Sequence, residues 1–94
     1  MGWTVVVEGE HKDRIACLSA EFRAGVNLDQ ERFRLLCYLD PYGNTMFNCL
    51  QIEDLIRDLV LLLAMEPNPL GGELIALVKR SQEDVHLYVC FYGD

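Results

Sequence analysis

The middle of the chain combines a tight turn with the start of a helix, and this combination restricts the fold most. Residues 40–43 read Asp-Pro-Tyr-Gly. Pro41 has its φ fixed near the value of the second turn position, and Gly43 stands where a positive φ is easiest to adopt. Asn48 is typical of a helix N-cap, and Gln51 is placed to complete a capping box. We therefore predict a chain reversal that leads into a helix.

Two helices are predicted in the second half of the chain. The first runs from Asn48 to about Glu66, and Pro67 and Pro69 end it because proline cannot continue a helix. The second covers residues 70–81, where apolar residues recur at helical spacing. The stripe of the first helix that should face the core consists of Ile52, Leu55, Ile56, Leu59, Leu62 and Leu63.

Strands are predicted near both ends of the chain and around the turn. Residues 3–8 and 85–92 carry apolar side chains at alternate positions, which is typical of half-buried strands. Residues 33–39 read as a strand entering the turn, and residues 45–47 as its partner. Residues 14–22 fit a strand or a short helix, and a hairpin with the first strand favours the strand. The predicted fold class is α+β, a mostly antiparallel sheet with two helices packed on one face.

Composition indicates one soluble domain that spans residues 1–94. The chain is 51% apolar and 24% charged, which leaves room for one core and no second domain. Only eight residues are Lys or Arg and the net charge is -7, so we expect no nucleic-acid partner, because phosphate binding needs clustered basic residues. The longest apolar run, residues 59–65, is far shorter than the roughly 20 residues that span a bilayer. No membrane partner is expected.

The four cysteines are interpreted as reduced thiols. Cys17, Cys37, Cys49 and Cys90 contain no C-x-x-C spacing, so the pattern gives little support to a zinc site. The first residues lack the basic segment and long apolar core of a secretory signal, so a disulfide framework is not implied. We expect a cytoplasmic location, no metal ion and no cofactor.

One face of the last predicted strand is a candidate ligand-binding surface. It carries His86, Tyr88 and Tyr92. Cys90 shares this face, but four residues along a strand separate it from His86 by about 13 Å, too far for a nucleophile and its base. We predict no catalytic residue and favour a protein that is not an enzyme. Catalysis by His86 with a residue from elsewhere remains the alternative.

The outer face of the first predicted helix is a candidate partner-binding surface. Helical spacing places Val60 and Leu61 there, next to acidic residues. An apolar spot ringed by charges is typical of a protein-binding face. The alternative is that a loop or the second helix covers the spot, which would leave an ordinary solvated helix face. The predicted surface consists of Glu53, Asp54, Arg57, Asp58 and Leu61, with Tyr42 on the nearby turn.

The same middle segment resembles a pattern in small uncharacterised bacterial proteins, some of them associated with toxin-immunity loci. The pattern is Asp-x-Tyr-Gly-x-Thr-x-Phe-Asn-x-x-Gln over residues 40–51, followed by a leucine-rich helix. The aromatic segment Tyr92-Gly93-Asp94 agrees with the same resemblance. The resemblance implies a bacterial origin and a non-enzymatic binding protein, and it carries no catalytic residue over.

These observations together predict a small acidic protein-binding module, an immunity-type inhibitor of a basic toxin or enzyme. Its acidic groups would steer the encounter with a basic partner. One alternative is a homodimeric structural protein, closed by the apolar spot or by the edge of the last strand. Another is a small-ligand-binding or catalytic protein that uses the sheet face around His86.

Overall fold

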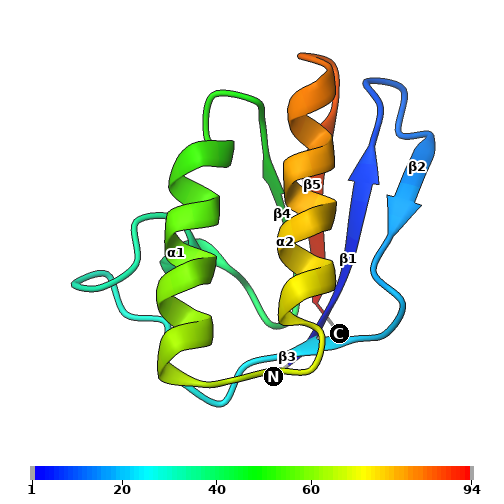
Figure 1. Ribbon diagram of the computed structural model, residues 1–94. Helices are drawn as coiled ribbons and strands as arrows, with labels where there is room; N and C mark the ends of the chain where they lie inside the picture. Colours follow the sequence, from blue (N-terminus) through cyan, green and yellow to red (C-terminus); the bar gives the residue numbers. More distant parts are fainter. Residues whose placement is uncertain (1, 94) are drawn as a thin grey trace.

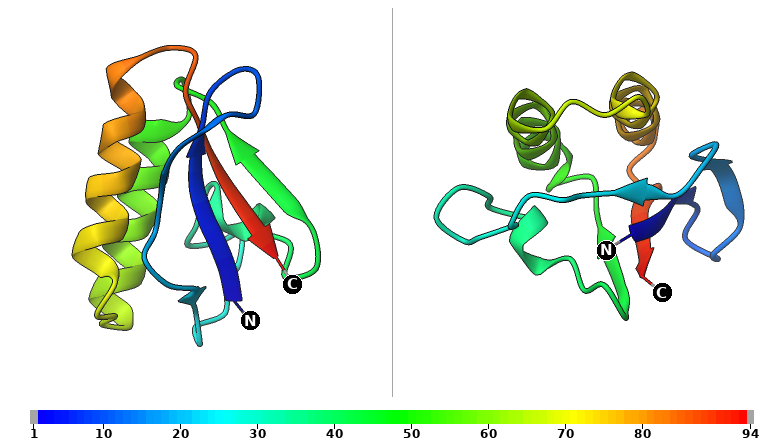
Figure 2. Two further views of the ribbon diagram at one scale, coloured as in Figure 1. Left: turned by 90° about the vertical axis from the view of Figure 1, so that its right-hand side faces the viewer. Right: turned by 90° about the horizontal axis from the view of Figure 1, so that it is seen from below.

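The computed structural model describes residues 2–93 and shows two layers, a sheet and a pair of helices (Figure 1). The sheet has five antiparallel strands, and both helices lie on one of its faces (Figure 2), which confirms the predicted α+β class. The strands are β1 (Gly2–Glu8), β2 (Arg14–Cys17), β3 (Phe22–Arg23), β4 (Asn44–Phe47) and β5 (Tyr88–Gly93). The helices are α1 (Ile52–Met65) and α2 (Gly71–Arg80), with short 3₁₀ helices η1 (Leu36–Tyr38) and η2 (Ser81–Glu83).

The first and last strands form the centre of the sheet. The strand order is β2-β1-β5-β4, and β3 pairs with the start of β1. β1 and β5 pair over six residues, from Trp3 opposite Gly93 to Glu8 opposite Tyr88. β1 is covered on both faces, and its run of three valines suits such a position because β-branched residues pack well in a buried strand.

The core lies between the sheet and the two helices. The side chains of Trp3, Val5 and Val7 from β1 meet those of Val89 and Phe91 from β5 in this layer. From the helices come Ile52, Leu55, Leu59, Leu62, Leu74, Leu77 and Val78. Four of the six residues in the predicted α1 stripe are fully buried and the other two, Ile56 and Leu63, are half-buried, so the predicted helix orientation is confirmed.

Neither helix reaches the size of a membrane span. Among residues 2–93, α1 has 14 residues and α2 has 10, and no helix combines the length and apolar character that crossing a membrane requires. Both helices lie where the sequence predicts them, although α1 begins later than expected. The Asn48 backbone N–H donates to Gln51 Oε1 at 2.9 Å and the Leu50 N–H donates to Asn48 Oδ1 at 3.0 Å, so these two side chains hold a turn. The predicted N-cap role of Asn48 is wrong, because the N-cap of α1 is Gln51 and no side chain caps it. The turn precedes the first helical residue, Ile52.

The strand interpretation of residues 14–22 is confirmed in its first part, because β2 forms a hairpin with β1. The connection is closed by two backbone bonds, from Gly9 N to the Asp13 carbonyl at 2.9 Å and from Lys12 N to the Gly9 carbonyl at 3.0 Å. Lys12 has a φ of 63°, in the left-handed region. A residue with a Cβ is less stable there than glycine by about 1–2 kcal/mol, so Lys12 holds a strained position.

The predicted strand at residues 33–39 is wrong. This segment is a loop with the short helix η1, and β4 pairs with β5 instead. The buried side chains are Phe33, Leu36 and Leu39, which recur every third residue. That spacing suits a 3₁₀ helix, in which residues three apart share a side, and it contradicts the period of two that a strand requires.

The predicted turn at residues 40–43 is confirmed, but its mechanism differs. Gly43 N donates to the Asp40 carbonyl at 3.3 Å, and Tyr42 N donates to Asp40 Oδ1 at 2.9 Å. No glycine within residues 2–93 has a positive φ, so the predicted conformation of Gly43 is wrong. The turn closes against the end of β5, where Gly93 N donates to the Gly43 carbonyl at 2.8 Å.

Gly93 and Gly72 should respond in opposite ways to alanine. A Cβ on Gly93 would lie 2.4 Å from the Asp40 carbonyl oxygen and 2.5 Å from backbone atoms of Pro41, so the turn must move. We expect Gly93→Ala to lower the free energy of unfolding by about 1–3 kcal/mol. A Cβ on Gly72 in α2 meets nothing within 4 Å, so Gly72→Ala should raise it by about 0.5–1 kcal/mol. Urea denaturation measures the free energy of unfolding of both variants. Equal midpoints for the two would contradict the close packing of Gly93 against the turn.

Candidate functional site

The outer face of α1 exposes a group of apolar side chains, as predicted. Val60 is 54% exposed, and Leu61 and Met65 are each 38% exposed. Within residues 2–93, no other helix or strand carries more than one exposed large apolar residue. Val60, Leu61 and Met65 are called the α1 patch below.

The charges around the α1 patch are mixed, because a loop brings arginines beside the predicted acidic residues. Asp54 Oδ1 lies 3.4 Å from an amino nitrogen of Arg57 and 3.4 Å from one of Arg34, which the loop before η1 supplies. Arg32, from the same loop, places an amino nitrogen 3.7 Å from the Met65 sulfur. Because the loop brings two arginines, the exposed Glu53 and the half-buried Asp54 do not dominate this surface.

Asp58 is absent from the surface on which it was predicted. It is only 2% exposed, and its Oδ2 accepts hydrogen bonds from Leu35 N at 2.7 Å and from Leu36 N at 3.0 Å. These bonds satisfy backbone groups at the start of η1, so the carboxylate holds the loop against α1. Helical spacing alone could not reveal this role, because the loop that covers Asp58 comes from a distant part of the sequence.

Tyr42 is exposed, but it does not join the α1 patch as predicted. It belongs to the turn that closes against the end of β5, and Figure 2 shows that turn on the side of the molecule away from the helices. Tyr42 is therefore separate from the surface around Leu61.

His86 does not lie on the sheet face on which it was predicted. It precedes β5, is exposed, and its Nδ1 lies 3.0 Å from Glu10 Oε2 in the β1–β2 hairpin. His11 Nε2 lies 3.4 Å from the other oxygen of Glu10, so both histidines of the chain meet one carboxylate. Tyr88 and Tyr92 do belong to β5 and are half-buried, but His86 is not their neighbour on the strand.

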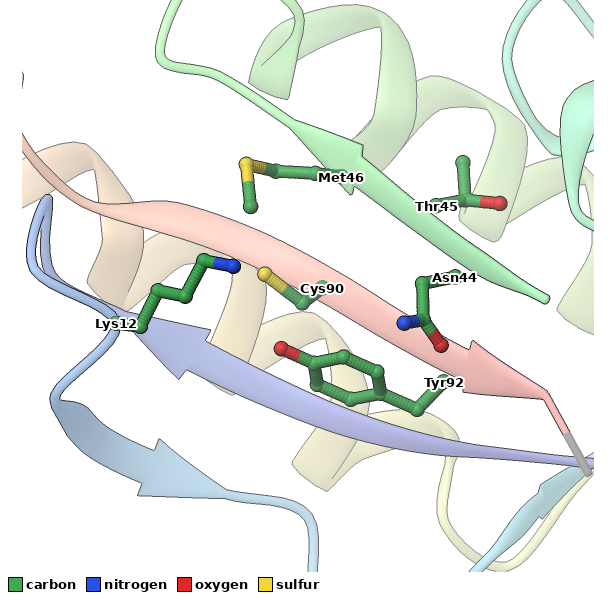
Figure 3. A pocket seen from close by; sticks show the side chains of 6 residues that line it. All are labelled: Lys12, Asn44, Thr45, Met46, Cys90 and Tyr92. Carbon is green, nitrogen blue, oxygen red and sulfur yellow. The ribbon is translucent and has the colours of Figure 1, made fainter.

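The sheet face away from the helices contains a cavity that is lined by Tyr92, one of the predicted ligand-binding residues, but not by His86 or Tyr88. Its volume is about 240 Å³. Figure 3 shows Cys90 and Tyr92 of β5 beside the side chains of Met46 and Asn44, which β4 contributes. The lining residues are Lys12, Asn44, Thr45, Met46, Cys90 and Tyr92. This space is called the sheet-face cavity below.

A buried carboxylate lies beneath the sheet-face cavity. Glu8 is 5% exposed, its Oε2 accepts a hydrogen bond from the Tyr92 hydroxyl, and its Oε1 accepts one from Cys90 Sγ at 3.5 Å. Burial, and then the neighbouring Glu8 charge, raise the pKa of Cys90 to about 11. The hydrogen bond to Glu8, and then burial, raise the pKa of Tyr92. Both groups keep their protons at neutral pH, so Cys90 is a poor nucleophile and this face suits binding better than covalent catalysis.

Lys12 brings a positive charge to the same place. Figure 3 shows its side chain extending from the hairpin toward Cys90 and Tyr92. Its charge opposes part of the rise in the pKa of Cys90, which agrees with this proximity. The sequence indicates this site through Tyr92 and Cys90, which share one face of the last predicted strand, but it gives no sign of the Lys12 conformation.

The described residues offer no arrangement suited to a metal ion. Within residues 2–93, no group of three or more His, Cys, Asp or Glu side chains is placed to hold one. Cys17, Cys37, Cys49 and Cys90 are free thiols.

Comparison with known proteins assigns no family to the chain. No protein-family model, no curated protein and no solved structure matches it. The resemblance to proteins of toxin-immunity loci therefore stays a prediction.

Substitution of Asp58 should reveal its role in the fold. Asp58→Ala leaves two backbone N–H groups without their acceptor, and we expect the free energy of unfolding to fall by about 2–3 kcal/mol. Asp58→Asn should lower the free energy of unfolding by less than Asp58→Ala does, because the amide oxygen of asparagine can accept both hydrogen bonds. Asp54→Ala, which removes only surface ion pairs, should change it by less than about 1 kcal/mol. Urea denaturation distinguishes these outcomes, and a similar small loss for Asp58→Ala would refute the assigned role.

Stability should decline at high pH partly through Cys90. Its pKa rises from 9.0 to about 11 on folding, so folding favours the protonated thiol. The resulting stabilisation is complete below pH 9 and is lost as the pH rises from about 9 to 11. The free energy of unfolding should therefore fall less steeply in Cys90→Ala than in the wild type over this range. Cys17→Ala, at an exposed thiol, is the control; identical slopes in all three proteins would rule out the effect.

Proposed function

We propose that this protein is a non-enzymatic binding module that recognises a protein partner through the α1 patch. The observation that carries the proposal is the gathering of Val60, Leu61 and Met65 on the open side of one helix. Exposed apolar residues that stand singly need no explanation, but a contiguous group rimmed by polar side chains marks an interaction surface. The rim is rich in arginine, a residue that interfaces favour.

The charge distribution favours a basic partner over a second copy of the chain. Two acidic side chains are paired with three arginines beside the α1 patch, namely Asp29 and Asp54 with Arg32, Arg34 and Arg57. The net charge of -7 therefore belongs to the rest of the molecule. Such a charge repels an identical protein and attracts a basic one, while the neutral patch permits close contact once the two have met.

The proposed mode of action is occupation of the partner. Leu61 and Val60 would supply the apolar contact, and the ion pairs of Asp54 would form part of a polar rim. Inhibition of a basic toxin or enzyme is the form of this function that the sequence resemblance favours. No step of this mechanism requires a catalytic group.

Leu61→Asp tests the proposal, with Val85→Asp as its matched control. Both substitutions place one added negative charge at an exposed apolar position, but Val85 lies in the connection before β5, outside the α1 patch. The proteins are immobilised and exposed to lysate of the source organism in moderate salt, and retained proteins are identified by mass spectrometry. We expect a basic protein that the wild type and Val85→Asp retain and that Leu61→Asp binds at least tenfold more weakly, because a buried unpaired charge is costly.

Two results would contradict the proposal. One is a set of retained proteins that is the same for all three immobilised chains. The other is a wild-type dimer in light scattering that Leu61→Asp converts to a monomer, because the α1 patch would then serve self-association.

A further inference from the structure

The sheet-face cavity is a second site, separate from the α1 patch. It opens on the sheet face away from both helices, between side chains from β5, β4 and the β1–β2 hairpin (Figure 3). Its wall combines the thioether of Met46 and the ring of Tyr92 with the amide of Asn44. The lining is polar and apolar in nearly equal parts, which suits a small molecule that has both a polar group and an apolar body.

Lys12 supplies the cavity with a cation that has no partner nearby. Within residues 2–93, no carboxylate oxygen lies within 4.0 Å of its amine. Its backbone occupies the left-handed region, where a hairpin normally has glycine or asparagine. The three-residue loop 10–12 requires a left-handed residue at this position, but glycine or asparagine would adopt it with less strain, so the turn does not explain the choice of lysine. A strained residue at the edge of a cavity is an indication of function.

The charges allow only one negative charge on a ligand. Among residues 2–93, Lys12 is the only basic residue that lines the cavity. Glu8 lies directly beneath, and the protons of Tyr92 and Cys90 are directed at its oxygens. A doubly charged anion would meet one ammonium group and the nearby carboxylate, so a monoanion fits this balance better.

We propose that the sheet-face cavity binds a small monocarboxylate with a compact apolar body. Lys12 pairs with the carboxylate, Asn44 donates a further hydrogen bond, and the apolar body packs between Met46 and the Tyr92 ring. The volume of about 240 Å³ is below the range of drug-sized ligands, so the acid is small. This inference does not depend on the partner proposed for the α1 patch.

Benzoate is a suitable probe, with benzamide as its uncharged counterpart. The full chain is labelled with ¹⁵N and titrated with each compound while two-dimensional NMR spectra are recorded. We expect benzoate to shift the backbone amide signals of Lys12, Asn44, Met46, Cys90 and Tyr92 saturably. The dissociation constant should be on the order of 1 mM, because the ligand is small and the lining residues Asn44 and Met46 are exposed to solvent. Benzamide should bind at least tenfold more weakly.

Lys12→Gln and Lys79→Gln form a matched pair, because each removes one positive charge. Lys79 lies near the end of α2, away from the cavity. Lys12→Gln should weaken benzoate binding at least tenfold, and Lys79→Gln should leave it unchanged. Lys12→Gly separates loss of binding from loss of folding, because glycine adopts a positive φ without strain. This variant should lose benzoate binding while its thermal unfolding midpoint stays equal to that of the wild type or rises.

The proposal fails if benzoate causes no saturable shifts, or if benzamide causes the same ones. It also fails if Lys12→Gly, folded as the wild type is, still binds benzoate with wild-type affinity. A titration with inorganic phosphate completes the test, because tighter binding of phosphate than of benzoate would overturn the monocarboxylate assignment.

Discussion

The pairing of β1 with β5 is the interaction on which the rest of the structure depends. Six residue pairs join these strands, and together they form the middle of the sheet. Their inner faces supply Trp3, Val5 and Phe91 to the layer on which both helices pack. Their outer faces bring Glu8 beside Tyr92, two residues 84 positions apart in the sequence. One ladder of backbone bonds thus positions both the core and the sheet-face cavity.

Local patterns in the sequence predict most of the fold because they match the geometry of each element. Alternation indicates the strands at both ends, and two prolines end α1 where the structure ends it. Residues 33–39 contradict the predicted strand because their buried positions, Phe33, Leu36 and Leu39, recur every third residue, whereas a strand requires a period of two. The turn at residues 40–43 lies where it is predicted, but its conformation differs from the prediction because Gly43 has no positive φ.

The candidate sites were less predictable because they depend on contacts between distant segments. Helical spacing correctly exposes Val60 and Leu61, which is a property of α1 alone. It cannot show that a preceding loop places Arg34 beside Asp54 and covers Asp58. Nor can a sequence pattern reveal the φ of Lys12, because lysine is an ordinary residue in a polar hairpin.

The central position of β5 has a consequence for synthesis of the chain on the ribosome. β1 is made first, yet the strand that covers its inner edge is not present until residues 88–93 have been added. Until then β1 exposes an unpaired, valine-rich edge, the kind of edge that invites pairing with other chains. Closing so long a loop is also slow, because its entropy is lost before the contacts form. The period of greatest exposure to aggregation is therefore the interval between synthesis of the first strand and emergence of the last.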